Sequence, residues 1–465
     1  MVVKWTGSDL VLLLELAQRT RGDRGRHLQQ CLRDAVRAGR LGAEERLPGS
    51  RELAVAARMA RGTVVEAYEQ LVAEGYLEAR SGSGTLVASA ALRGAAEPPG
   101  TPPGPRRFEV DLRPGFPDLS SFPADDWAWA LARAARSITR GQLTYGSPLG
   151  HPFAREAIAG ALRRTRAAET TPAAVALGSG FAQCVTLVLA VLAERGVGSL
   201  AVEDPGDRSV DDVAHSLGME VIGIPVDGEG MDVEALAESG AEAVIVTPAH
   251  QAPTGAVLSP SRRAQLIAWA DATGGWVLED DYDSEYRYDR QPVGALQGVA
   301  PDRVILLGST SKTHAPAIRI GWIAAPGVLL PQLTERKDAA DRGSSALDQF
   351  AFGLLLDSGR HDRHVRAMRS VYKRRRGVLV AALGDWAPWL RLTGIEAGFH
   401  GLLQLPSASA EGDVVERAAE RSVALRGLSG YSLLQSELPT LALGFGGSDE
   451  EQIEAGVRII ADLTR

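Results

Sequence analysis

The stretch GSTSKTHAPAIRIGW, residues 308–322, decides how the larger part of this chain is interpreted. It follows an apolar run that predicts a buried strand, so its polar residues begin where that strand ends. Lys312 supplies an amine, and Ser309 and Ser311 place hydroxyl groups close to it. Arg319, seven residues after the lysine, can bind a phosphate through two parallel hydrogen bonds. The stretch therefore predicts an amine beside an anion-binding site.

Short apolar runs alternate with helical segments along the whole of this region. Each run ends in a polar loop that carries Gly or Asp; the runs are AVALGSG, LAVEDPG, AEAVIVTP, GGWVLEDDY and RVILLGSTSK. Helical segments such as AQCVTLVLAVLAERG and SRRAQLIAWADATG lie between them. The alternation predicts an α/β domain with a mostly parallel sheet, in which ligands bind beyond the carboxyl ends of the strands.

Two other strand ends carry groups that would complete a site for pyridoxal 5′-phosphate. That cofactor needs an amine, an acid at its pyridine nitrogen and a cradle for its phosphate. Gly180 and Phe181 lie at a strand-to-helix junction, so their N–H groups could point at the phosphate. Asp280 ends an apolar strand, where a buried carboxylate and a pyridinium would keep each other charged. Tyr282, on the same side of that strand, could reach the phenolic oxygen of the cofactor.

Each of these signals has a simpler explanation when it is taken alone. A single lysine such as Lys312 is usually a surface residue, Asp280 could cap a helix, and Gly-Ser-Gly is often only a turn. The order of the motifs carries more information: a Gly loop, TPAHQAPTG, Asp-x-Tyr, Ser-x-Ser-Lys and then Arg.

The first 88 residues have a different pattern. Apolar residues recur at helical spacing in RHLQQCLRDAVRAG (26–39), and further helices are expected from Ser50 and from Arg61. YLEARSGSGTLVA, which follows, predicts a small β-hairpin. Helix, helix, turn, helix and hairpin is the order of a winged helix-turn-helix, which reads DNA with the first residues of its recognition helix.

Residues at the helix starts and in the hairpin are the candidates for contact with DNA. They are Ser50, Arg51, Arg61, Gly62, Thr63, Arg80 and Ser81. Arginine, hydroxyl and backbone N–H groups are the usual phosphate ligands, and the glycines of the hairpin would let the backbone approach a groove. Solvated surface charges are the alternative for any one of these arginines.

Proline, glycine and alanine dominate SAALRGAAEPPGTPPGPRR, residues 89–107, which predicts an extended linker. It separates an expected DNA-binding domain, 1–88, from a second domain, 108–465.

Cys31 and Cys184 suit a reduced, cytoplasmic compartment and have no spacing typical of a metal site. No apolar run is long enough to span a membrane, and the net charge of −8 excludes polyanion binding by bulk charge. The basic segment at 360–377 is expected to be a solvated helix face, with DNA contact as the alternative.

RLPGSRELAVAARMARGTVVEAYEQLVAEGYLEARSGSGTLVA resembles the winged helix of GntR-type bacterial repressors. The order of the site motifs after the linker is similar to that of fold-type I aminotransferases. Nearly all of residues 24–465 resemble the MocR/GabR-type regulators, and the resemblance includes DLRPGFPDLSSFP, YGSPLGHPFAREAIA and GFHGLLQLP. The resemblance implies a large, mostly parallel sheet with helices and a small C-terminal α+β subdomain.

The same resemblance implies a role for each site residue. Lys312 would form the Schiff base with pyridoxal 5′-phosphate, Asp280 would pair with the pyridine nitrogen, and Tyr282 would contact the 3′-oxygen. Tyr145 is similar to the tyrosine that reaches into the partner subunit's site in a head-to-tail homodimer. The phosphate would be held by Ser309, Ser311, Arg319, Gly180 and Phe181.

Gly62 departs from the winged-helix pattern, which often has Asn or another polar residue there, and three positions depart from the patterns of the large domain. Ala252, preceded by His250 and Gln251, stands where aminotransferases carry Asn before Pro-Thr-Gly, and Asp207 stands where the regulators often have Tyr. Many aminotransferases place an arginine near Ala442 to hold the substrate carboxylate, yet residues 427–457 contain none. Because a fixed carboxylate helps transamination, sustained turnover of an ordinary amino acid is not expected.

The expected function is that of a transcriptional regulator that binds an operator in double-stranded DNA. Its large domain would respond to an amine, an amino acid or pyridoxal 5′-phosphate itself. The first alternative is an active aminotransferase that carries an accessory DNA-binding module. The second is a regulator that has lost its cofactor, because Asp207 and Ala252 weaken the site.

Overall fold

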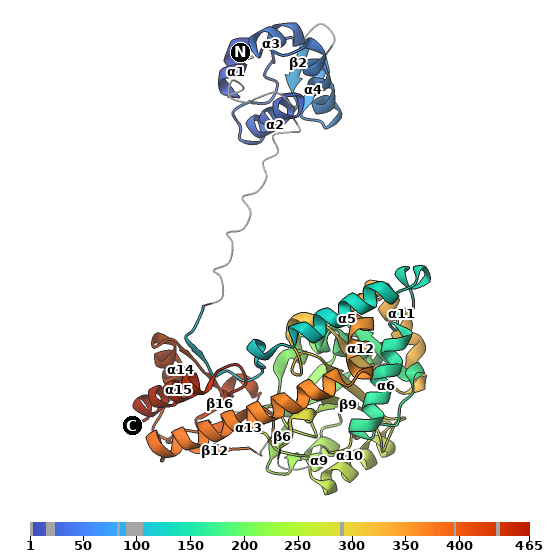
Figure 1. The fold of residues 1–465 in the computed structure, drawn as a ribbon, viewed down its shortest axis with the longest axis vertical. Coiled ribbons are helices and arrows are strands. Elements are labelled where there is room, and N and C mark those ends of the chain that lie inside the picture. Colours follow the sequence, from blue (N-terminus) through green and yellow to red (C-terminus); the bar gives the residue numbers. More distant parts are fainter. Residues whose placement is uncertain are drawn as a thin grey trace. The chain divides into compact units, whose positions relative to one another are not determined.

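The computed structural model describes residues 3–14, 24–80, 84–89, 106–288, 293–394, 397–433 and 438–465. Two compact units make up the chain, residues 1–105 and 106–465 (Figure 1). Most of the expected linker, residues 90–105, lies outside the described residues. No described helix has the length and apolar character that crossing a bilayer requires.

The smaller unit is a four-helix cluster with a two-stranded antiparallel hairpin. Its elements are α1 (Gly7–Leu13), α2 (Arg24–Arg37), α3 (Ser50–Ala56), α4 (Arg61–Ala73), β1 (Leu77–Arg80) and β2 (Gly84–Val87). Leu28, Leu32, Leu53 and Leu71 are among the buried side chains that form its core. The predicted helix order and the hairpin are confirmed, although α2 begins and ends two residues before the predicted bounds.

A short turn fixes the angle between α3 and α4. Arg58 has a positive φ of 52° in this turn, and α4 begins three residues later. The hydroxyl of Tyr68, on the buried face of α4, donates a hydrogen bond of 3.0 Å to the carbonyl oxygen of Pro48. This bond ties the loop before α3 to the middle of α4, so the starts of both helices are held in place.

The larger unit is built on one eight-stranded sheet. The strands are β4 (Val175–Gly178), β5 (Ser199–Asp204), β6 (Glu220–Asp227), β7 (Gly230–Met231), β8 (Ala243–Val246), β9 (Trp276–Asp281), β10 (Val304–Ser309) and β11 (Gly321–Ala324). Their spatial order is β4-β11-β10-β9-β8-β5-β6-β7. Neighbours from β6 to β10 pair in parallel, whereas β11 is antiparallel to both of its neighbours and β7 is antiparallel to β6. The predicted mostly parallel sheet is therefore confirmed.

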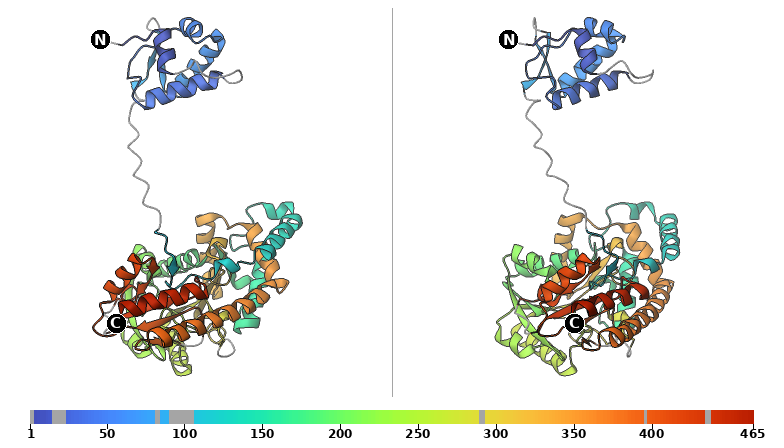
Figure 2. Two further views of the ribbon diagram at one scale, coloured as in Figure 1. Left: turned by 60° about the vertical axis from the view of Figure 1, so that its left-hand side comes forward. Right: turned by 90° about the vertical axis from the view of Figure 1, so that its left-hand side faces the viewer.

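Helices cover both faces of this sheet (Figures 1 and 2). They are α5 (Ala124–Ser137), α6 (Pro152–Arg166), α7 (Phe181–Glu194), α8 (Asp211–Ser216), α9 (Val233–Glu238), α10 (Pro260–Thr273), α11 (Leu330–Asp341) and α12 (Ala346–Asp357). Along β10, Ile305 and Leu307 pack with α7, whereas Leu306 packs with α6 and α12 on the opposite face. Alternate burial on two faces explains why the strands are continuous apolar runs.

A smaller subdomain completes the unit. It contains β3 (Val110–Asp111), α13 (Arg360–Trp386), β12 (Arg391–Thr393), β13 (His400–Gln404), α14 (Glu411–Glu420), β14 (Val423–Ala424), β15 (Arg426–Gly427), β16 (Thr440–Gly444) and α15 (Glu450–Leu463). Its four-stranded sheet has the order β12-β13-β16-β15, and β14 pairs with β3. This is the α+β subdomain expected at the C-terminal end.

Candidate functional site

The ends of β9 and β10 bring the predicted lysine and aspartate to one edge of the sheet. The two strands are parallel, and Asp280 stands opposite Leu307. Lys312 lies in the turn after β10, where its Nζ donates a hydrogen bond of 2.7 Å to the carbonyl oxygen of Gly115. Burial lowers the pKa of Lys312, although nearby carboxylates including Asp280 oppose this effect. A lowered pKa leaves more neutral amine, which is the form that attacks a carbonyl.

Asp280 has the environment of a carboxylate that lacks a cationic partner. Burial raises its pKa well above the usual range, and the charge of Asp207 raises it further, while Lys312 lowers it. Its Oδ1 is buried and accepts no hydrogen bond from the described residues. A buried acceptor without a donor fits a protonated ring nitrogen, so this observation supports the fit of a pyridoxal ring at this edge.

The start of α7 and Arg319 form a place for an anion. Gly180 precedes α7 with φ 84° and ψ 177°, and no side chain caps the helix. A Cβ at this position would lie 3.0 Å from the guanidinium of Arg319. That guanidinium donates a hydrogen bond of 2.6 Å to the carbonyl oxygen of Ser179. The helix N–H groups, which begin at Phe181, and the guanidinium can therefore act on one phosphate.

The two serines beside the lysine lie where the sequence placed them. Ser309 is buried at the last position of β10, and Ser311 is half-buried in the following turn. The backbone N–H of Ser311 donates a hydrogen bond of 3.4 Å to the Oγ of Ser309. Both hydroxyl groups therefore stand at the strand end from which Lys312 projects.

Tyr282 lies in a buried group of rings that the sequence did not predict. Its hydroxyl donates a hydrogen bond of 2.8 Å to the carbonyl oxygen of His250. Asp283 Oδ2 lies 2.8 Å from His250 Nδ1, and the rings of His250 and His400 are 4.6 Å apart. Burial lowers the pKa of His400 to about 3, so this ring is neutral. The rings of His250, His400 and Tyr282 thus lie together beside Asp283.

Sequence reasoning identified His250 as a departure from the aminotransferase motif but gave Asp283 and His400 no role. The signals were present as YDSEY and GFHG. Neither motif indicates that these residues meet, because the contact forms only in the folded chain. Gly398 packs closely against both partners: a Cβ at this position would lie 2.4 Å from the imidazole of His250 and 2.5 Å from the carboxylate of Asp283.

The structure also places Tyr145 and two of the positions that depart from the family patterns, Asp207 and Ala442. The side chain of Tyr145 is 78 % exposed, and the guanidinium of Arg342 lies over its ring at 5.7 Å. Asp207 is exposed and caps the short helical turn Arg208–Val210, where its carboxylate accepts a 3.0 Å hydrogen bond from the N–H of Ser209. Ala442 is fully buried in β16, where it stands opposite Leu402 of β13.

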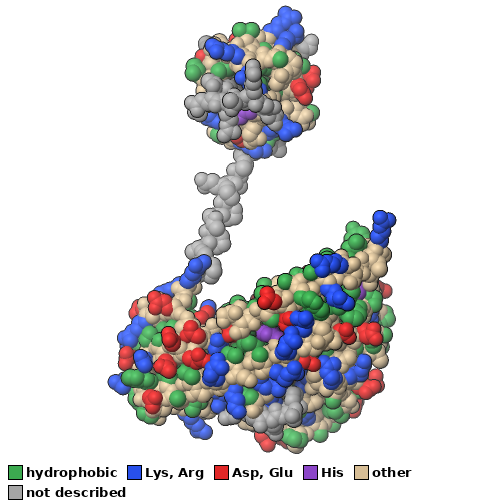
Figure 3. Space-filling model, viewed as in Figure 1, with side chains coloured by type: hydrophobic (Ala, Val, Ile, Leu, Met, Phe, Trp, Pro, Cys, Tyr) green, Lys and Arg blue, Asp and Glu red, His purple; other side chains and the backbone are tan. Residues whose placement is uncertain are grey.

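The basic segment at 360–377 is part of α13, and several of its arginines have acidic partners. Arg360 and Arg363 both contact Asp126. Farther along, Arg374 pairs with Glu450 at 2.6 Å, and the buried Arg375 pairs with Asp118 at 2.8 Å. Figure 3 shows blue and red side chains intermingled over this face. The expected solvated face is therefore only a partial description, because these charges also join α13 to neighbouring segments.

In the smaller unit, most of the predicted DNA-contacting residues that the structure describes are exposed. Arg61 and Gly62 are exposed at the start of α4, which no side chain caps, and Thr63 is half-buried. Arg51 is exposed in the first turn of α3, after the half-buried Ser50.

The guanidinium groups of these residues differ in whether they have partners. Arg51 and Arg61 have no hydrogen-bond or ion-pair partner within the described part of the chain. Arg80, in contrast, pairs with Glu78 at 3.1 Å and lies 3.9 Å from Glu44. Ser81 lies outside the described residues.

Taken together, a winged helix and a unit with the fold of an aminotransferase define a class of protein, a regulator with an aminotransferase-like second domain. Comparisons with known proteins agree with this. Residues 25–87 match the family described as bacterial regulatory proteins, gntR family, and residues 110–442 match the family described as aminotransferase class I and II.

Relatives that contain both units share nearly the whole length of the chain. The probable rhizopine catabolism regulatory protein MocR of Rhizobium meliloti is 32 % identical over 461 residues, which cover 93 % of this chain and 92 % of the relative. The pyridoxine biosynthesis transcriptional regulator PdxR of Corynebacterium glutamicum is 31 % identical over 94 % of both chains. The chain therefore belongs to the family of transcriptional regulators that join a gntR-type helix-turn-helix to a class I and II aminotransferase domain.

Solved structures similar to the larger unit are aminotransferases. The Pyrococcus horikoshii kynurenine aminotransferase, solved with PMP, has a TM-score of 0.70 and 25 % sequence identity, and the match covers 77 % of this chain and 91 % of that one. The fold-type I prediction is thus confirmed, and this fold implies dependence on pyridoxal phosphate.

Proposed function

We propose that this regulator holds pyridoxal 5′-phosphate on Lys312 and binds operator DNA through residues 1–88. The observation that carries the proposal is a half-buried amine at the strand edge that also holds a buried, unpartnered carboxylate oxygen of Asp280, together with an uncapped helix start. When bound, the cofactor supplies an aldehyde that condenses with amines. Residues 89–107 would join this unit to the DNA-binding unit.

Each side chain has one task in this proposal. Lys312 provides the amine that bonds to the cofactor, and Asp280 keeps the ring nitrogen protonated. Tyr282 would donate its hydroxyl to the ring oxygen in place of the His250 carbonyl, which accepts that hydrogen bond in this structure. The residues that would hold the phosphate are Ser309, Ser311, Arg319, Gly180 and Phe181.

Borohydride reduction tests the cofactor assignment directly. The full chain is incubated with excess pyridoxal 5′-phosphate, reduced, digested and examined by mass spectrometry. The chain contains four lysines, Lys4, Lys312, Lys337 and Lys373, so each is a separate readout. A pyridoxyl group is expected on Lys312 and must disappear in Lys312→Ala but not in the control Lys373→Ala. Modification of the other lysines alone would refute the assignment.

DNA binding is proposed to involve a head-to-tail homodimer, in which Tyr145 of one chain reaches the site of its partner. The high exposure of Tyr145 supports this, because an exposed tyrosine is available to a second chain. A dimer with two winged helices requires paired half-sites. Footprinting of DNA flanking the gene is expected to protect two half-sites, and sedimentation is expected to give twice the chain mass. A monomer that protects one half-site would contradict this part.

Effector binding is proposed to change how the dimer is arranged. An amine, an amino acid or the free cofactor can do this only if it binds one arrangement more tightly than the other. Screening these ligands for a change in cofactor absorbance, followed by DNA binding with each positive ligand, identifies the effector. A ligand that changes the absorbance and leaves DNA affinity unchanged is not the effector.

An active aminotransferase is the second candidate, and the fold of the larger unit favours it. The absence of arginine from residues 427–457 and the buried Ala442 oppose it, since nothing in that segment can pair with a substrate carboxylate. Incubation with amino donors and 2-oxoglutarate separates the two candidates. Formation of many equivalents of glutamate per chain would establish the enzyme, whereas one equivalent or less is expected.

A further inference from the structure

The larger unit contains a pocket that is distinct from the lysine site. It has a volume of about 330 Å³ and lies between α6, α12, the start of α13 and the short helix η7 (Ser284–Tyr286). Neither Lys312 nor Asp280 lines it. One wall is apolar and consists of Ile158, Leu162, Trp322, Phe352, Leu356 and Val365. Its volume lies within the range that holds a small organic ligand.

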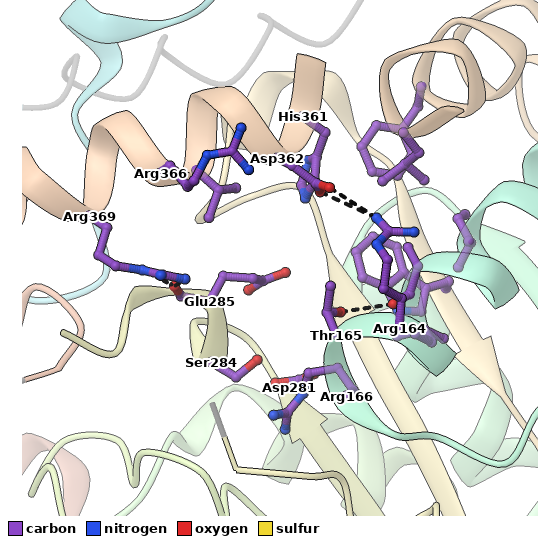
Figure 4. Close-up of a pocket in the computed structure, with 17 residues that line it drawn as sticks. Arg164, Thr165, Arg166, Asp281, Ser284, Glu285, His361, Asp362, Arg366 and Arg369 are labelled. Atoms are coloured by element: carbon purple, nitrogen blue, oxygen red, sulfur yellow. Dashed lines mark hydrogen bonds and ion pairs between the residues drawn. The ribbon is translucent and has the colours of Figure 1, made fainter. Parts of the chain in front are cut away.

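Glu285 is the unusual residue of this pocket. Figure 4 shows its carboxylate pointing into the cavity. No other residue in the described part of the chain donates a hydrogen bond to this carboxylate, and no arginine or lysine pairs with it. Burial raises its pKa to about 7, and the charge of Asp281 adds to this effect. The pocket thus contains an acid whose negative charge lacks a partner.

None of the four arginines that line the pocket pairs with the Glu285 carboxylate: Arg366 has no side-chain partner within the described residues, and the other three are engaged elsewhere (Figure 4). Arg164 pairs with Asp362 at 3.1 Å, and Arg166 pairs with Asp281 at 2.7 Å. Arg369 donates hydrogen bonds of 2.6 and 3.0 Å to the backbone carbonyl of Glu285 rather than to its carboxylate.

Two further acceptors beside Glu285 also lack partners. Ser284 is 2 % exposed, and its Oγ forms no hydrogen bond within the described residues. Asp281 uses Oδ2 for Arg166, and its side chain is 7 % exposed, but its Oδ1 is buried without a donor. Buried polar atoms are normally satisfied, so two orphan oxygens at the lining of one cavity indicate a missing donor.

We propose that this pocket binds a primary amine with an apolar body. An ammonium group has three N–H donors and a positive charge, which match the carboxylate of Glu285, the Oδ1 of Asp281 and the Oγ of Ser284. The alkyl or aromatic part would lie on the apolar wall opposite. An anion could pair with Arg366, but it has no donor for the Oδ1 of Asp281 and would face the negative charge of Glu285.

This second site shares its wall with the lysine site. Asp281, Ser284 and Glu285 face the pocket, and Asp280, Tyr282 and Asp283 of the same segment face the other side. His361, also at the pocket, stacks on His314, with ring centroids 5.1 Å apart. An occupant therefore touches the elements that position the lysine, and it could couple to that site through them.

Isothermal titration calorimetry with 2-phenylethylamine tests the proposal on the full chain. The protein is first reduced with borohydride, so that any cofactor stays bonded and cannot exchange with the amine. We expect one amine per chain, and we expect 2-phenylethanol, which lacks the charge, to bind at least tenfold more weakly. This ligand comparison needs no variant. Equal binding of the two ligands, or tighter binding of 3-phenylpropionate, would overturn the proposal.

A pair of substitutions locates the site. Glu285→Gln keeps the shape of the side chain and removes its charge, so it is expected to weaken amine binding at least tenfold. Glu156→Gln, on the exposed side of α6, is the matched control and is expected to change nothing. If both variants bind the amine like the unchanged protein, the ligand lies elsewhere and the assignment is wrong.

Discussion

Carboxyl groups buried without a cation are a recurring feature near the carboxyl ends of the central strands. Glu203 on β5 is a second case beside Asp280. Its carboxylate accepts hydrogen bonds from the N–H and hydroxyl of Thr247 and from the amide of Gln251. Burial nevertheless raises its pKa to about 7. Hydrogen bonds from neutral donors therefore do not fully offset the cost of burying the charge.

The pH dependence of stability follows from the raised pKa of Glu203. The folded protein binds this proton more tightly than the unfolded chain, so between pH 4.5 and about 7 stability falls as pH rises. Glu203→Gln removes the titrating group and should stabilise the larger unit at pH 8 by up to roughly 3 kcal/mol. At pH 4.5 the effect should be small. Thermal unfolding at both pH values measures the difference, and an equal shift at both would contradict the explanation.

At the surface of the smaller unit, whether an arginine pairs with an acidic side chain predicts how much it contributes to DNA affinity. Arg61 has no partner within the described residues, whereas Arg80 is held by Glu78 and Glu44. Arg61→Ala should weaken DNA binding about tenfold or more at constant salt. Arg80→Ala should weaken it less than threefold, since acidic neighbours already offset its charge. Fluorescence anisotropy compares the two, and a larger loss for Arg80 would reverse this ranking.

For individual residues, the sequence predicted site residues correctly where the residue type itself indicates the chemical role. Lys312 and Asp280 lie at one strand edge because parallel strands end together, which a sequence pattern can indicate. The contact of Asp283 with His250 joins residues 33 positions apart, and Glu285 was not singled out. Its significance depends on the absence of a partner, which only the packed structure reveals.

Among the elements, α7 depends on the conformation of one glycine. Gly180 has φ 84° and ψ 177°, a region that is essentially restricted to glycine. Gly180→Ala should strain the backbone by about 1–3 kcal/mol and push a methyl group toward Arg319. Affinity for pyridoxal 5′-phosphate should therefore fall at least tenfold.

Gly160→Ala is the matched control, because this glycine lies inside α6 with no atom within 4 Å of an added Cβ. Alanine is favoured over glycine in a helix, so this variant should be at least as stable and should bind the cofactor normally. Fluorescence titration of the cofactor measures both variants. Normal cofactor affinity in Gly180→Ala would show that the phosphate does not lie at this helix start.

The sequence predicted which helices and strands exist better than it predicted where they end or which residues they contact. Five of the central strands were visible as apolar runs because both faces are covered, whereas β6 is mostly half-buried or exposed and was not singled out. The length of α13, 27 residues, was also missed, since only its basic part was distinctive. Which carboxylates meet its arginines depends on the tertiary fold, and the sequence contains no signal for it.

The whole molecule consists of two units with separate cores, so each should fold alone. The cores share no residue, as the smaller one ends at Val87 and the larger one begins at Val110. This division follows from the sequence, because a segment rich in proline and glycine cannot continue either core. The boundary at 105 and 106 lies inside the predicted linker.

Cleavage between the units tests what the connection contributes. A protease site placed within residues 90–105 would release the two units from a dimer already bound to cofactor. Two winged helices in one dimer act on DNA at a high effective concentration, so cleavage should weaken operator binding by a factor of about 10²–10⁴. The cofactor absorbance of the larger fragment should not change, since its site is complete without the smaller unit. The uncut chain that carries the same protease site is the control. If the released winged helix bound the paired half-sites as tightly as the intact chain, the two DNA-binding units would act independently, and an effector held in the larger unit would have no route to the operator.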